Sequence, residues 1–159
     1  MTTSLQEQFT PWSACFGCGP ANEQGLRIGS FVDGDALIAK WEPDARYEAI
    51  HGFINGGVVA TLLDCHSAWT AAWHLKERLG VDTLPLAVTA ELTVTYPQPT
   101  PVGTMLHLRA QVAEASDRKA VVQGEAVSDG VVRARSRGVF VVAGEFAPKA
   151  GTIGPEGHS

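Results

Sequence analysis

Hydrophobic and polar residues alternate in two short runs near the start of the chain. Apolar positions from Gly25 reach Phe31-Val32, and the stretch from Ala36 to Trp41 alternates along its length. Between the two runs stands Asp33-Gly34-Asp35, and an Asp-Gly pair in that place is typical of a β-hairpin turn. We therefore expect two antiparallel strands, followed by a loop over residues 44–54.

The spacing of apolar residues changes to that of a helix at the glycine pair Gly56-Gly57. Hydrophobic side chains recur at helical intervals up to Arg78, and the opposite side is also mostly apolar or small, as in a helix covered on most sides. Gly80 is the expected C-cap. One carboxylate, Asp64, lies inside this run, where an ionised carboxylate costs free energy unless it is paired or hydrogen-bonded. Asp64 is therefore either a well-satisfied structural group or a group with a chemical role.

Four further strands are expected after the helix, and turn signals at Ser116-Asp117 and Asp129-Gly130 separate the last three. The strands cover residues 87–96, 105–115, 118–128 and 131–142. The order is two strands, one long helix and a four-strand antiparallel meander, so we expect an α+β fold with about six strands wrapped around one long central helix. One helix cannot cover both faces of such a sheet, and we expect a second copy of the chain to close its other face or its edge.

The composition is that of a single domain without a strongly charged surface. The chain has 159 residues, 45% of them hydrophobic, and its 12 basic and 17 acidic residues give a net charge of −5. That balance argues against a nucleic-acid surface and against a basic patch for anionic lipid. Residues 1–12 lack the features of a secretory signal, and Asp64 interrupts the longest apolar stretch, so we expect no membrane span and a cytoplasmic protein.

The expected domain organisation has three parts. Residues 1–24 form an irregular N-terminal segment, residues 25–143 form the folded domain, and residues 144–159, which are rich in Gly and Pro, form a flexible tail.

The N-terminal segment holds Cys15 and Cys18, which are spaced as in half of a zinc site or in a redox pair. No second pair of this kind follows, and the third cysteine, Cys65, lies in the expected helix. We therefore interpret the pair as a packed turn, and we expect no metal and no cofactor.

Three segments of the chain carry a more specific pattern. They are Cys15 to Pro20 with Asn22 and Gly25-Leu26; Gly52 to Gly57 continued to Asp64; and Val88 to Leu92 continued to Tyr96, with Pro99 and Gly103. In this order and spacing the chain resembles the hotdog-fold acyl-CoA thioesterases, most closely their phenylacetyl-CoA thioesterase (PaaI-like) branch. The resemblance implies the hotdog fold, hydrolysis of an acyl-CoA thioester to a carboxylate and free CoA, and a homodimer or homotetramer.

The resemblance also implies roles for individual residues. Gly56 would offer its backbone N–H to the thioester carbonyl at the start of the helix, where unpaired amides and the helix dipole favour negative charge. Asp64 would act as general base on water or as nucleophile. Thr89 falls where the family often places a Ser or Thr that positions the water. Because the family builds its site across a dimer, Asp64 of one subunit would meet Thr89 of the other.

One position departs from the family pattern. The family usually has His-Gly-Gly, whereas this chain has Asn55-Gly56-Gly57. An asparagine side chain can donate and accept hydrogen bonds but cannot be protonated, and His51 could take over part of that role. We therefore expect Gly57, Asn55 and His51 to bind substrate, beside a catalytic set formed by the glycine amide, the helix carboxylate and the strand threonine.

Plainer interpretations stay open for these residues. Asp64 could be a structural carboxylate, Thr89 an ordinary strand threonine, and the glycine pair a point of close backbone packing. Because Asn55 replaces the family histidine, the alternative function is a non-catalytic acyl-CoA-binding or regulatory hotdog protein. A hotdog hydratase is less favoured, because that branch places an Asp and a His together at the N-terminal end of the helix. Candidate cations for the phosphates of CoA, by charge alone, are Arg109, Arg118, Lys119, Arg133, Arg135 and Arg137.

Overall fold

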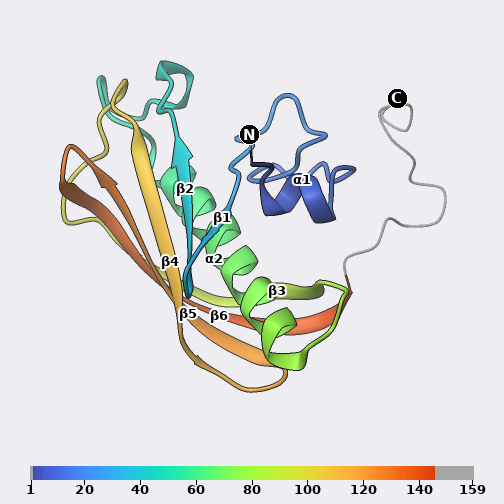
Figure 1. Cartoon of the computed structure of the whole chain (residues 1–159). Coiled ribbons are helices and arrows are strands. Elements are labelled where there is room, and N and C mark those ends of the chain that lie inside the picture. Colours follow the sequence, from blue (N-terminus) through green and yellow to red (C-terminus); the bar gives the residue numbers. More distant parts are fainter. Residues whose placement is uncertain (1, 146–159) are drawn as a thin grey trace.

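A curved antiparallel sheet wraps around one long helix. In the computed structural model, which describes residues 2–145, helix α2 (Gly56–Leu79) lies against the sheet, and the segment with the short helix α1 (Leu5–Phe9) lies on the other side of α2 (Figure 1). The six strands are β1 (Phe31–Asp33), β2 (Ala36–Trp41), β3 (Pro85–Thr95), β4 (Leu106–Ala115), β5 (Lys119–Ser128) and β6 (Val131–Glu145). The expected α+β hotdog architecture is confirmed, and most of the tail expected over 144–159 lies outside the described residues.

Both ends of α2 are capped by the residues that the sequence places there. Asn55 is the N-cap, and its side-chain Oδ1 accepts a hydrogen bond of 2.8 Å from the Gly57 N–H. Gly80 is the C-cap, with φ of 63° in the left-handed region, which glycine adopts without a steric cost. The predicted C-cap is confirmed, and Asn55 acquires a structural role that the sequence comparison with the family did not suggest.

The helix is apolar nearly all round because two different layers cover it. Leu62, Leu63 and Leu75 are fully buried in the main core, which the strands share. On the side away from the sheet, Phe9 from α1 packs edge-on against Trp73, with 6.3 Å between the ring centroids. The N-terminal segment therefore supplies the cover that the concave sheet alone cannot.

A series of buried hydrogen bonds connects this N-terminal segment to α2 and to the sheet. His66, fully buried, places Nε2 at 3.0 Å from the Leu37 carbonyl oxygen and Nδ1 at 2.8 Å from Ser30 Oγ. A carbonyl oxygen only accepts, so Nε2 carries the proton and Nδ1 accepts from Ser30. Ser30 Oγ in turn accepts from Gln6 Nε2 at 3.0 Å. Burial lowers the pKa of His66 to about 4, so the imidazole is neutral in the folded protein.

The strand order differs from the expected meander. The sheet runs β1-β2-β4-β5-β6-β3, so only β4, β5 and β6 form a meander, and β3 pairs with β6 at the far edge. The proline-rich connection after β3 carries the chain back across the start of α2, where Phe53 forms a bridge with Pro101 and the Ile54 N–H donates to the Thr100 carbonyl at 2.9 Å. Within residues 2–145, β3 thus has a strand neighbour on one side only.

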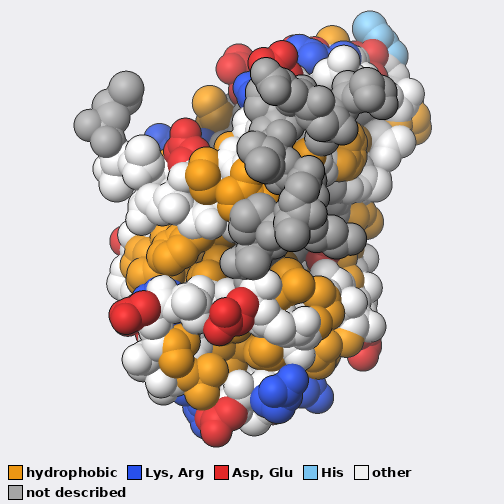
Figure 2. Space-filling model, turned by 90° about the vertical axis from the view of Figure 1, so that its right-hand side faces the viewer, with side chains coloured by type: hydrophobic (Ala, Val, Ile, Leu, Met, Phe, Trp, Pro, Cys, Tyr) orange, Lys and Arg blue, Asp and Glu red, His pale blue; other side chains and the backbone are white. Residues whose placement is uncertain are grey.

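The surface seen from the right of Figure 1 mixes apolar and charged side chains. In Figure 2 hydrophobic side chains spread over the middle of this face, while the Lys and Arg side chains lie toward its margins. No helix within residues 2–145 has both the length and the apolar character needed to cross a membrane.

The capping role of Asn55 predicts a specific pattern of stability. Replacing Asn55 by Ala removes the acceptor for the Gly57 N–H, and we expect the free energy of unfolding to fall by about 0.5–2 kcal/mol. Asn55→Asp keeps an oxygen in the same place and should unfold close to the wild type in a urea titration. Equal losses in the two variants would contradict the capping role.

Candidate active site

Asp64 and Thr89 form a hydrogen-bonded pair between the helix and the edge strand. The Thr89 hydroxyl donates to Asp64 Oδ1 at 2.7 Å. Asp64 is half-buried on α2, and Thr89 is exposed on β3. Among the described residues, Thr89 is the one hydrogen-bond donor to this carboxylate, and it contacts Oδ1.

A β-bulge in β3 puts Thr89 on the helix side of the sheet. Thr89 stands opposite Phe140 of β6 and Glu91 stands opposite Val139, which leaves Ala90 as an extra residue. Such a bulge re-aims the side chains on either side of it. Strict alternation along the strand predicts that Thr89 and Leu92 lie on opposite faces of the sheet. That prediction is wrong because of the bulge. Thr89 pairs with Phe140 and Leu92 pairs with Gly138, and these two residues of β6 share one face.

The pair lies within one chain, which corrects the expected arrangement. We expected Thr89 from a second subunit, but β3 follows α2 directly and runs beside it, so one subunit supplies both side chains. The hydrogen bond to Asp64 therefore needs no threonine from a second subunit.

The start of α2 offers one free amide. The Gly57 N–H is bonded to the Asn55 side chain, and the N–H groups of Val58 and Val59 are bonded to the Asn55 carbonyl, at 3.1 and 3.2 Å. No acceptor for the Gly56 N–H is recorded within residues 2–145. This amide carries the positive end of the helix dipole and can face developing negative charge.

Tyr96 fixes the position of this amide, and sequence reasoning did not select it as a site residue. Its hydroxyl donates to the Gly56 carbonyl at 2.7 Å, joining the chain just after β3 to the first residue of α2. Partial burial raises the pKa of Tyr96, so it stays protonated and can donate. The one signal in the sequence was its place at the end of the third family segment.

The structure does not bring His51 to the carboxylate. The His51 side chain is 99% exposed, and its Nδ1 lies 3.9 Å from Glu48 Oε2 in the loop before α2. Asn55 acts as the helix cap described above. Of the expected site residues, the structure therefore joins the carboxylate to the threonine and leaves the histidine in solvent.

Within residues 2–145, none of the candidate cations forms an ion pair with the Asp64 carboxylate. Arg109, Arg135 and Arg137 line a hollow of about 530 Å³ on the outer face of the sheet, opposite the helix. Arg109 also pairs with Asp33 at 2.7 Å, and Arg133 donates to Ser128 Oγ at 2.9 Å. A cavity of about 900 Å³ between the N-terminal segment and the sheet includes neither Asp64 nor Thr89.

Comparison with known proteins identifies the family of this chain. The family model described as "Thioesterase superfamily" matches residues 51–134, a range that holds the glycine amide, the carboxylate and the threonine. A thioesterase superfamily protein from Shewanella loihica is 32% identical, with 82% of this chain and 94% of that chain covered and a TM-score of 0.65. No curated protein sequence matches the chain.

Two more distant structures share the fold. The PaaI protein of the phenylacetic acid degradation operon of E. coli is 21% identical, with 76% of this chain and 82% of that chain covered and a TM-score of 0.63. A Streptococcus mutans protein bound to acetyl CoA is 17% identical, with 76% and 91% covered and a TM-score of 0.62. The family model spans more than half of the chain, and together with the Shewanella relative it shows that this protein belongs to the thioesterase superfamily.

Proposed function

We propose that this protein is an acyl-CoA thioesterase, which hydrolyses a thioester to a carboxylate and free CoA. The observation that carries the proposal is the Asp64 carboxylate, held through one oxygen by Thr89 and open at the other, beside an incompletely paired sheet edge. The choice of CoA thioesters draws support from the acetyl CoA in the Streptococcus mutans relative and from the phenylacetic acid operon of the E. coli one.

The geometry favours Asp64 as a general base. The Thr89 hydroxyl donates a hydrogen bond to Oδ1, and its oxygen keeps lone pairs that can accept a hydrogen bond from a water molecule. That water can also donate to Oδ2, which then takes its proton as the water oxygen attacks the thioester carbon. The C–S bond breaks, and the protonated carboxyl returns the proton to the CoA thiolate.

The oxyanion of this reaction needs a hydrogen-bond donor, and the Gly56 amide of the same helix lies well apart from Asp64. Gly56 and Asp64 are eight residues apart on one helix, which separates them by about 12 Å along its axis. A reacting carbonyl must lie about 3 Å from both the attacking group and the oxyanion donor. We therefore assign the oxyanion amide to Gly56 of a second subunit.

The open edge of β3 is where that subunit would bind. β3 is 11 residues long and pairs with β6 on one side, and Thr89 lies on it. A long unpaired edge is a template for a second strand, and a two-fold axis there would extend the sheet and bring two α2 helices together. Such a homodimer would hold two equivalent sites, each with residues from both chains.

Substitutions at Asp64 and Thr89 test the base and its partner. We expect Asp64→Asn to lower kcat by about 100-fold or more, because the amide cannot accept the proton. Thr89→Ala should lower kcat by about 10- to 100-fold through misplacement of the water, while Thr89→Ser should keep most of the activity. A panel of acyl-CoAs assayed with a thiol reagent measures all three. Equal hydrolysis by the wild type and Asp64→Asn would contradict the assignment, and tight acyl-CoA binding without turnover by the wild type would favour the binding-protein alternative.

The amide of Gly56 can be removed with little change to the helix. Gly56→Pro deletes the N–H at the first helical position, where proline is well tolerated, and Asn55 already has φ −55° and ψ 131°, which suit a residue before proline. We expect kcat to fall by about 100-fold or more. Gly56→Ala is the matched control: it keeps the N–H, and its Cβ would lie 3.5 Å from the Tyr96 ring, an ordinary contact. Equal activity of both variants would exclude this amide.

Mixed dimers test whether two subunits share one site. In a heterodimer of Asp64→Asn and Gly56→Pro chains, one site keeps both the carboxylate and the amide, and the other site loses both. Random exchange of the two inactive variants should therefore restore about a quarter of wild-type activity. No recovery after exchange verified by native mass spectrometry would place the whole site within one chain.

A further inference from the structure

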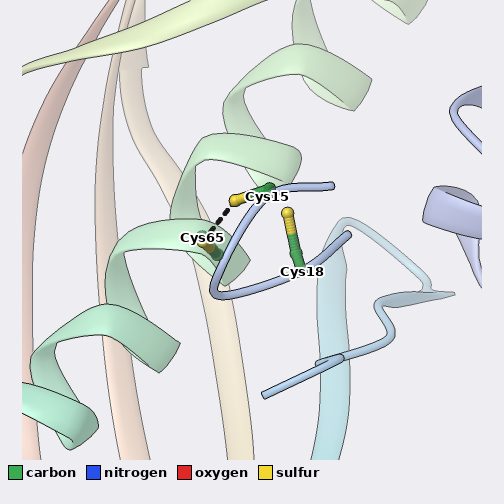
Figure 3. Close-up of side chains that lie close together, drawn as sticks. All are labelled: Cys15, Cys18 and Cys65. Atoms are coloured by element: carbon green, nitrogen blue, oxygen red, sulfur yellow. Dashed lines mark hydrogen bonds between the residues drawn. The ribbon is translucent and has the colours of Figure 1, made fainter. Parts of the chain in front are cut away.

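All three cysteines of the protein meet at one place behind Asp64. Cys15 and Cys18 come from the N-terminal loop and Cys65 from α2, and Figure 3 shows their sulfur atoms turned toward one another. The three Sγ atoms lie within 4.8 Å of one another, and those of Cys15 and Cys65 are 3.9 Å apart. The fold thus supplies the third thiol that sequence spacing did not predict.

The loop is built to hold the first two thiols against the helix. The Gly19 N–H donates to the Cys15 carbonyl at 2.9 Å, and the Ile28 N–H donates to the Gly17 carbonyl at 3.0 Å. A Cβ on Gly17 would lie 2.4 Å from Cys65 Sγ, and a Cβ on Gly19 would lie 2.3 Å from the Cys15 nitrogen. Only glycine permits this close approach, so the Cys-Phe-Gly-Cys-Gly segment is shaped around the cluster.

Neighbouring N–H groups favour the charged form of two of the thiols. The backbone of Gly17 and Cys18 favours the thiolate of Cys15, and the Trp69 side chain favours that of Cys18. N–H groups directed at sulfur stabilise thiolates and tune metal–thiolate sites.

We propose that Cys15, Cys18 and Cys65 bind one thiophilic metal ion, with Zn²⁺ as the reference ion. A tetrahedral zinc with Zn–S bonds of about 2.3 Å needs sulfur atoms about 3.8 Å apart, and the 3.9 Å separation of Cys15 and Cys65 meets this requirement. The Cys-x₂-Cys spacing is that of zinc ligands. The group holds three ligands among the described residues, so the fourth position goes to water or to an added thiol.

The ion would act as a clamp between the N-terminal segment and the helix. Cys65 directly follows Asp64, so the ion would hold the turn of α2 that carries the carboxylate, from the side opposite β3. The expected effect is a higher stability of the metal-loaded protein, because an ion that binds the folded state raises the melting temperature by mass action.

Metal binding by the intact reduced protein tests the proposal without reference to turnover. After treatment with a chelator, the wild type should take up one equivalent of Zn²⁺ in calorimetry, retain it through gel filtration and melt at a higher temperature. Co²⁺ in place of Zn²⁺ should show the intense thiolate-to-cobalt absorption of a sulfur-rich tetrahedral site.

Single-site variants identify the ligands. Cys15→Ser, which changes an exposed side chain, should lose both the one-equivalent binding and the cobalt absorption, and Cys65→Ser should do the same. His107→Ala, which removes an exposed imidazole that zinc could bind adventitiously, should keep both. Equal metal uptake by the wild type and Cys15→Ser would overturn the proposal. So would a reduced wild type that takes up no metal and forms only a Cys15–Cys65 disulfide under an oxidant, seen by mass spectrometry as the loss of two hydrogens.

Discussion

The structure depends on covering a helix that is apolar on nearly every side. The concave sheet covers one side of α2, and the N-terminal segment covers another through Phe9 against Trp73 and through the buried hydrogen bonds from Gln6 to His66. Burial of this apolar surface fixes the helix between the two layers. Each polar side chain of α2 must then find its hydrogen-bond partner in the layer that it faces.

Asp64 and Cys65 show this division on a single turn of α2. The carboxylate faces β3, where it accepts one hydrogen bond from Thr89, and the adjacent thiol faces the N-terminal loop, where it meets two others. Successive residues on a helix point to different sides, so one turn can serve two kinds of chemistry. The partner of each side chain depends on the layer that it faces: a strand hydroxyl for Asp64 and two thiols for Cys65.

Helix geometry also separates the two groups of α2 to which we assign the chemistry. The free amide and the carboxylate belong to the same rigid helix, and its rise keeps them apart by a fixed distance. In the function that we propose, the open edge of β3, next to Thr89, is where a second chain would supply its Gly56 amide.

Local patterns in the sequence determined most elements: the period of the apolar residues, the Asp-Gly turns and Gly80 set the long helix and the later strands to within a few residues, because these signals act over a few neighbours. They missed helix α1, and they started the first strand near Gly25, whereas β1 begins at Phe31. The family segments likewise indicated Gly56, Asp64 and Thr89. Tertiary structure alone decided that β3 lies at the far edge, that a bulge at Ala90 turns Thr89 toward its own helix, and that Cys65 joins Cys15 and Cys18. Each depends on contacts between distant parts of the chain, where a one-residue change of register redirects a side chain.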